Sequence, residues 1–180
     1  MLARLLDLFR DKGFDGASLA DISESTGLGK SSLYHHFPKG KVDIAVQVLG
    51  HLEAQLTDAL FEPMRSNGTP RQKLDRMLDT IEHFYDGGKK ACLLERLSAS
   101  VDAKHFRRPL GRAFKTWIDA VEALGLESGL PRATARARAE DLVVRIEGAL
   151  VVTAGTGDTR VFARTIRDLR DSVLTPVAKS

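Results

Sequence analysis

One stretch decides the fold of this chain: residues 18–44, which read SLADISESTGLGKSSLYHHFPKGKVDI. Ser18 is a favourable first cap of a helix, and Asp21, three residues on, can complete a capping box with it. Gly27 can supply the positive φ with which many helices end. The pattern therefore predicts a helix that starts at Ser18, a tight turn at Gly27, and a second, short helix that begins near Gly29.

The second helix has two different faces. Leu33 and Phe37 lie four residues apart, so they share one buried side. The outer side then carries Lys30, Ser31, Ser32, Tyr34 and His35. Serine and lysine side chains can reach base edges, and lysine, tyrosine and histidine can bind phosphate oxygens. A short helix of this kind is suited to the major groove of DNA.

The run Gly27-x5-Leu33-Tyr34-x-His36-Phe37, followed by a lysine at the start of the next helix, resembles the DNA-binding domain of the TetR family of transcriptional repressors. The resemblance is strong over the N-terminal part of the chain. Elsewhere it extends to length, helical character and a looser local likeness around residues 91–94. It implies a helix-turn-helix head, a dimer, and a body that binds a small molecule.

The hinge Pro38-Lys39-Gly40-Lys41 is similar to that of the LmrA/YxaF-like subgroup, in which Pro-Gly-Gly-Lys is usual. By this resemblance Lys30, Ser31, Ser32 and His35 contact bases or the groove, Tyr34, His36 and Lys41 contact phosphates, and Lys39 adds positive charge on the groove side. Two departures stand out. Gly29 replaces the more usual serine cap. Members usually carry a further, often basic, segment before the first helix, whereas Met1 falls inside the helix expected here, which leaves open whether the sequence is truncated.

Taken singly, these residues have plainer interpretations. His35 and His36 are ordinary surface histidines in most proteins, and Tyr34 is equally suited to half-buried packing. Their shared spacing with Gly27 and Lys41 favours DNA binding over these alternatives. The net charge of +3 and the pI of about 9.1 are compatible with it, and we expect binding that weakens with salt.

Composition sets the protein class. The 180 residues are 43% hydrophobic and 28% charged, as in a soluble globular protein. The single cysteine, Cys92, allows no intramolecular disulfide and no cysteine metal cluster, and it suits a reducing cytoplasm. It is either a small buried hydrophobe, the more common case, or a thiol sensor. No signal peptide, membrane span, metal-ligand spacing, nucleophile motif or phosphate loop is present, so we expect a cytoplasmic protein without cofactor or metal that is not an enzyme.

Apolar periodicity predicts an all-α protein of about nine helices, because no strand-like alternation competes with it. Outside residues 18–40 the expected helices cover about 2–13, 41–64, 70–86, 93–101, 104–124, 133–155 and 159–174. Residues 1–40 would form the DNA-binding head and residues 41–180 the ligand-binding and dimerisation domain. The helix that begins at Lys41 is long enough to belong to both.

The last two helices carry broad apolar stripes. The expected dimer contacts are Leu142, Val143, Ile146, Leu150, Phe162, Ile166, Leu169 and Val173. Two such helices could pair with their copies into a four-helix bundle. The alternative is that these stripes only close the core of one chain.

A ligand pocket is implied by the resemblance. Its candidate residues are Met77, Ile81, Phe84, Tyr85, Phe114, Trp117, Glu147 and Leu150. Large apolar walls with few polar groups would suit a lipophilic or aromatic effector, although aromatic residues at helical spacing are also common in protein cores.

These observations predict a ligand-responsive repressor that binds a palindromic operator as a homodimer and is released from double-stranded DNA by a small-molecule effector. Two alternatives use the same head: a regulator without small-molecule control, and an activator.

Overall fold

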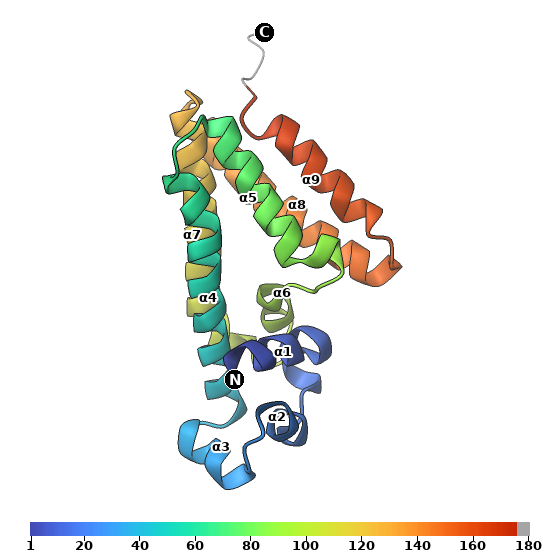
Figure 1. Ribbon diagram of the computed structural model, residues 1–180. Helices are drawn as coiled ribbons and strands as arrows, with labels where there is room; N and C mark the ends of the chain where they lie inside the picture. Colours follow the sequence, from blue (N-terminus) through green and yellow to red (C-terminus); the bar gives the residue numbers. More distant parts are fainter. Residues whose placement is uncertain (176–180) are drawn as a thin grey trace. The chain divides into compact units, whose positions relative to one another are not determined.

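The computed structural model describes residues 1–175, with the side chains of residues 59–65 excepted. The described part consists of helices and connecting turns, which confirms the all-α prediction (Figure 1). The α-helices are α1 (Leu2–Gly16), α2 (Leu19–Thr26), α3 (Lys30–His36), α4 (Lys41–Arg65), α5 (Pro70–Phe84), α6 (Leu93–Ser98), α7 (Ala103–Glu127), α8 (Arg132–Thr156) and α9 (Arg160–Ser172). A short 3-10 turn, η1 (Asp86–Gly88), follows α5.

The chain divides into two compact units. The first contains Met1–Gln55 and Ala91–Ala113, and the second contains Leu56–Lys90 and the described residues from Phe114 onward. This division differs from the predicted boundary at residue 40. The reason is that the first half of α4 is buried with the head through Ile44, Ala45, Val48, Leu49 and Leu52, and that α6 packs on α1.

The first unit has an aromatic core around Phe14. The φ of 69° at Gly13 bends α1 near its end, and this bend carries Phe14 into the interior. The ring of Phe14 lies 6.0 Å from that of Phe9 and 5.1 Å, edge to face, from that of Phe106 on α7. Phe14 is 2% exposed and therefore belongs to the core of this unit.

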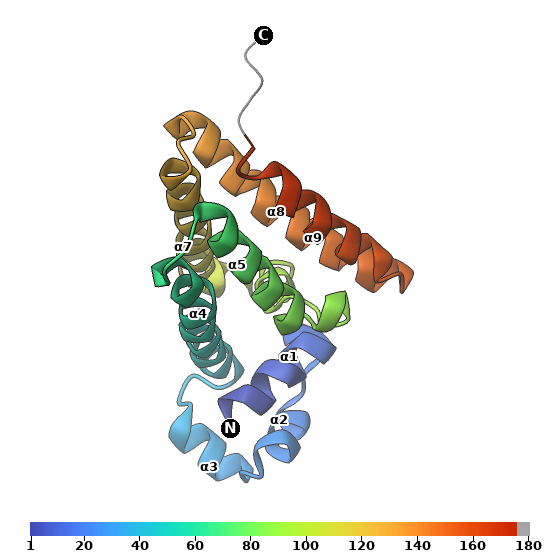
Figure 2. The same cartoon turned by 45° about the horizontal axis from the view of Figure 1, so that its top comes forward.

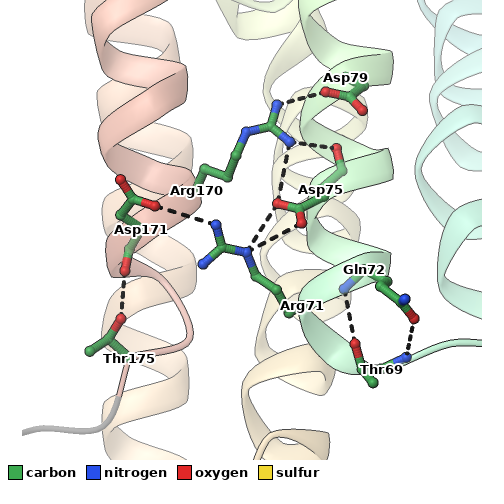
Figure 3. A network of polar contacts seen from close by, with 8 residues as sticks. All are labelled: Thr69, Arg71, Gln72, Asp75, Asp79, Arg170, Asp171 and Thr175. Atoms are coloured by element: carbon green, nitrogen blue, oxygen red, sulfur yellow. Dashed lines mark hydrogen bonds and ion pairs between the residues drawn. The ribbon is translucent and has the colours of Figure 1, made fainter.

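The second unit packs α9 against α8 and α5, as Figure 2 also shows. Thr69 and Gln72 form a reciprocal capping box at the start of α5, and Pro70 occupies its first turn. Charged side chains join α5 to α9 (Figure 3). Arg170 binds Asp75 at 3.2 Å and Asp79 at 2.6 Å. Partly exposed pairs of this kind stabilise a fold only slightly.

The residues of the predicted dimer stripe are buried within the single chain. Its eight residues are only 0–4% exposed within a single chain: Leu142, Val143, Ile146, Leu150, Phe162, Ile166, Leu169 and Val173. They form the seam between α8, α9 and the rest of the second unit, so little of their surface is exposed in the single chain. The free face of α8 carries other apolar residues, Val144 (68% exposed), Val151 (50%) and Val152 (47%).

Two smaller expectations concern Cys92 and membrane spans. Among the described residues Cys92 takes part in no disulfide, and it is 2% exposed, which agrees with the buried hydrophobe. Among the described helices, none combines the length and apolarity needed to cross a bilayer.

Candidate nucleic-acid interface

The start of α2 is fixed by the predicted capping box. The Asp21 backbone N–H donates to Ser18 Oγ at 3.1 Å, and the Ser18 backbone N–H donates to Asp21 Oδ2 at 2.8 Å. The ammonium of Lys12 on α1 donates a hydrogen bond to Asp21 Oδ1 at 2.5 Å. The hydrogen bond from Lys12, and then those from Ser18, hold the pKa of the Asp21 carboxyl far below its usual value. One carboxylate therefore both caps α2 and ties it to α1.

The turn between α2 and α3 follows the sequence pattern closely. Gly27 has φ 73°, and its N–H donates to the Ser23 carbonyl at 2.9 Å. The Ser23 hydroxyl donates to the Leu28 carbonyl at 2.6 Å, and the Thr26 hydroxyl accepts from the Leu28 N–H at 3.3 Å. These short polar side chains satisfy the backbone carbonyl and N–H of Leu28 in the turn, so the path of the chain between α2 and α3 is defined locally.

The short helix α3 presents a polar outer surface. Leu33 is its one buried residue, and Phe37, directly after it, is 1% exposed. The remaining residues of α3 and the following lysine are exposed: Lys30, Ser31, Ser32, Tyr34, His35, His36 and Lys39. Gly29 starts the helix without a side-chain cap, as the sequence suggests. We call this set of seven exposed residues the α3 face.

Tyr34 and Gly40 lie together at the hinge. Gly40 has φ 65°, and a Cβ added there would lie 3.7 Å from Tyr34 Cε1. The Gly40 N–H donates to the Phe37 carbonyl at 2.8 Å, which closes the turn into α4. The ring of Tyr34 thus packs beside the hinge while the residue stays 46% exposed.

Lys41 is placed differently from the other predicted contacts. Its ammonium donates to the Ala17 carbonyl at 2.9 Å and to the Asp15 carbonyl at 3.4 Å, and it lies 4.5 Å from the centre of the Phe14 ring. These partners hold it against the link between α1 and α2. The structure therefore gives Lys41 the role of a brace within the head, a role for which the sequence holds no local signal.

The predicted pocket residues separate into two groups. Met77, Ile81, Tyr85, Trp117 and Leu150 are core residues of the second unit, and Phe84 is half-buried beside Tyr85 with ring centres 5.1 Å apart. Phe114 and Glu147 instead line an open groove of about 530 Å³ together with Ile118, Glu140, Val143 and Val144. Sequence reasoning missed Ile118, Glu140 and Val144, although their spacing from Phe114 and Glu147 on α7 and α8 is helical and offers a signal.

Comparisons with known proteins agree with this geometry. The family model described as "Bacterial regulatory proteins, tetR family" matches residues 2–48. The HTH-type transcriptional regulator LmrA of Bacillus subtilis (strain 168) is 22% identical over 158 residues, which are 85% of this chain and 84% of LmrA. The uncharacterized HTH-type transcriptional regulator YxaF of the same strain is 25% identical over 158 residues, 84% of this chain and 81% of YxaF.

Solved structures share the fold. A TetR transcriptional regulator from Legionella pneumophila matches with a TM-score of 0.86 at 18% identity over 95% of this chain and 94% of its own. The TetR family regulator CifR, a cysteine mutant complexed with 26-bp double-strand operator DNA, matches with a TM-score of 0.74 at 19% identity over 95% and 94%. With its capped α2, glycine turn and polar α3 face, the N-terminal part of the chain matches the tetR family model, and the chain as a whole is similar to HTH-type transcriptional regulators of that family.

Proposed function

We propose that this protein is a ligand-responsive repressor that binds a palindromic operator as a homodimer and is released by a small lipophilic or aromatic effector. The observation that carries the proposal is the α3 face: buried Leu33 and Phe37 hold the helix in place while its polar residues stay free. Ser31, Ser32 and His35 are suited to base edges, and Lys30 and Lys39 to phosphates.

A dimer is supported by the free face of α8. Val144, Gly148, Val151, Val152 and Gly155 follow one another at helical spacing and are all exposed. A Cβ added at Gly148 or Gly155 would meet no other atom within 4 Å, so a second helix can approach this face closely. Packing of α8 on its own copy about a two-fold axis would match the symmetry of a palindromic operator.

Coupling between ligand and DNA is proposed to run through α7. This helix carries Phe114 and Ile118 at the groove in the second unit and Phe106 in the first unit. Phe106 packs edge to face on Phe14, against which Lys41 is braced. A ligand that shifts α7 would disturb the contact between Phe106 and Phe14. Ligand and DNA are coupled if the ligand binds the conformation of the free protein more tightly than that of the DNA-bound protein.

The test uses fluorescence anisotropy. Purified full-length protein is titrated into labelled duplexes from upstream of its own and neighbouring genes, and into scrambled duplexes, at one fixed salt concentration. We expect tight, saturable binding to one palindromic fragment at a stoichiometry of one dimer per site. A reporter placed downstream of that fragment then separates repression from activation, and loss of binding on addition of an effector separates the repressor from a regulator without small-molecule control.

A further inference from the structure

The C-terminal end of α1 is joined to the starts of two long helices. Lys41, the first residue of α4, donates from its ammonium to the carbonyl oxygens of Ala17 at 2.9 Å and Asp15 at 3.4 Å. The carboxylate of Asp15 also accepts a hydrogen bond from the backbone N–H of Val101 at 3.2 Å. Val101 lies in the link between α6 and α7, residues 99–102. We call these three contacts, which all lie in the first unit, the Asp15 junction.

The charges of the Asp15 junction suit the backbone groups that they meet. The last carbonyl groups of a helix carry partial negative charge, so the ammonium of Lys41 binds there favourably. The N–H groups at the start of a helix carry partial positive charge, which favours a carboxylate. The first turn of α7 is fully described and contains no acidic residue of its own, while the preceding Asp102 lies 3.9 Å from His105. Asp15 therefore brings a carboxylate to this end of α7 from a different helix.

Two consecutive residues of α1 contact α7 and the link that leads into it. The bend at Gly13 carries Phe14 inward, where its ring meets that of Phe106 at 5.1 Å. The next residue, Asp15, stays exposed and accepts from the N–H of Val101. Val101 is itself 86% exposed, so its side chain adds little packing. The contact between Asp15 and the link is therefore polar, whereas the contact between Phe14 and α7 is apolar.

We propose that Asp15 is a positioning residue through which the link between α6 and α7 sets the operator affinity of the head. Its carboxylate holds the link, while its carbonyl and that of Ala17 hold the ammonium of Lys41 at the hinge after α3. When the link moves away, the end of α1 is released, and Lys41 loses the position from which it orients the hinge. The inference rests on the proposed function, because operator affinity is the property that the Asp15 junction sets.

An exposed hydrogen bond is suited to this role. It contributes little to the stability of the fold, so it can open while α1, α4 and α7 remain folded. The alternative is that Asp15 only caps the link locally. The two cases differ at Gly40, whose N–H donates to the Phe37 carbonyl at 2.8 Å in the hinge turn. If Asp15 acts on the hinge, its loss exposes this N–H to solvent more often. If it is only a local cap, Gly40 does not respond.

The experiment removes the hydrogen bond and the charge separately. Asp15→Ala removes both, Asp15→Asn keeps an oxygen that can accept from Val101, and Asp11→Ala removes the same charge from another exposed residue of α1. Hydrogen exchange of individual amides in the full-length protein is followed by NMR. We expect Asp15→Ala to speed exchange at both Val101 and Gly40, and Asp15→Asn and Asp11→Ala to leave Gly40 as in the parent. An unchanged Gly40 in Asp15→Ala, whether or not Val101 responds, would overturn the proposal.

Operator affinity provides the functional measurement, by fluorescence anisotropy with the palindromic duplex at one salt concentration. We expect Asp15→Ala to bind at least about fivefold more weakly than Asp11→Ala, the lower end of usual couplings between sites, and Asp15→Asn to bind like Asp11→Ala. In a Lys41→Ala background the effect of Asp15→Ala should disappear, because Asp15 acts on the hinge through Lys41. Equal affinities of Asp15→Ala and Asp11→Ala, or an effect that simply adds to that of Lys41→Ala, would contradict the assignment.

The two proposals fail separately in these measurements. Protein that prefers the palindrome but whose Gly40 amide does not respond to Asp15→Ala overturns the Asp15 junction and leaves the regulator standing. Protein that prefers no duplex, while its Gly40 amide responds, supports the coupling between the link and the hinge and overturns the operator-binding repressor. A response of both Gly40 and operator affinity supports both proposals.

Discussion

The ammonium of Lys41, at the start of α4, donates a 2.9 Å hydrogen bond to the carbonyl oxygen of Ala17, at the end of α1. This bond joins the hinge after α3 to the segment that leads into α2. Both ends of the helix-turn-helix are therefore held by one side chain, which also lies against the Phe14 ring at 4.5 Å. The orientation of the α3 face depends on this brace as well as on the Leu33 and Phe37 contacts.

The brace predicts different consequences for two lysines of the hinge. Lys41→Ala should lower the free energy of unfolding by about 1–3 kcal/mol, because a hydrogen bond from a charged donor is lost. It should weaken operator binding without changing its dependence on salt. Lys39→Ala should leave stability unchanged and reduce the slope of log affinity against log salt by about one, because one phosphate contact is lost.

Anisotropy titrations at several salt concentrations, together with urea unfolding, distinguish these outcomes. A salt slope that falls as much in Lys41→Ala as in Lys39→Ala would mean that the ammonium leaves Ala17 and binds a phosphate in the complex.

Asp21 predicts a specific pH dependence of stability. Its pKa in the folded protein is lowered, first by the hydrogen bond from Lys12 and then by those from Ser18. A group with a depressed pKa stabilises the folded state above its unfolded pKa of about 3.9, and this stabilisation is lost as the pH falls toward the folded pKa. The melting temperature of Asp21→Asn should therefore lie below that of the parent at pH 7, and the two should converge as the pH is lowered through 4 toward 2.

Calorimetric melts of both proteins across that range provide the check. Asp171→Asn serves as the control, since Asp171 lies outside the head and its side chain is 74% exposed. A difference between the parent and Asp21→Asn that stays constant with pH would show that the carboxylate charge contributes nothing.

The α8 face predicts a variant that separates dimerisation from folding. Gly148→Leu adds a side chain where a Cβ meets no other atom within 4 Å in the single chain, and leucine favours the helix more than glycine does. The melting temperature of the monomer should not fall. In light scattering after size-exclusion chromatography, however, the parent should be a dimer and the variant should dissociate.

Gly88, unlike Gly148, lies where an added side chain should destabilise the single chain. It has φ 93°, and a Cβ there would lie 2.7 Å from Phe162 Cβ. Gly88→Ala should therefore destabilise the fold by roughly 1–3 kcal/mol through strain and overpacking. If Gly148→Leu unfolds like Gly88→Ala, or stays dimeric, α8 is not the dimer helix.

Much of the fold follows from local signals. Ser18, Gly27, Thr69 and Pro70 mark helix ends, and the structure has those ends where the residues predict them. The first helix, expected over about residues 2–13, continues instead through a kink at Gly13 to Gly16. The α3 face could be predicted because Leu33 and Phe37, four residues apart, mark the buried side of the helix and leave the other residues exposed.

The faces of α8 could not be assigned in this way. This helix is apolar on two sides: Leu142, Ile146 and Leu150 are buried, whereas Val144, Val151 and Val152 are exposed. Periodicity alone does not tell which stripe meets its own chain and which remains free, because that depends on where α9 and α7 pack. The position of the Lys41 ammonium and the open groove between α7 and α8 likewise depend on contacts between helices that are distant in sequence.

The central claim is that the α3 face reads DNA sequence, and one measurement tests it most directly. The parent protein and a Ser31→Ala/Ser32→Ala variant are titrated by fluorescence anisotropy into the upstream palindromic duplex and a scrambled duplex at the same salt concentration. The account predicts that the parent prefers the palindrome and that the variant, equally stable, loses about 1–3 kcal/mol of that preference for each base contact removed while its affinity for the scrambled duplex is unchanged. A parent that binds every duplex equally, or a variant that keeps the full preference, would contradict it.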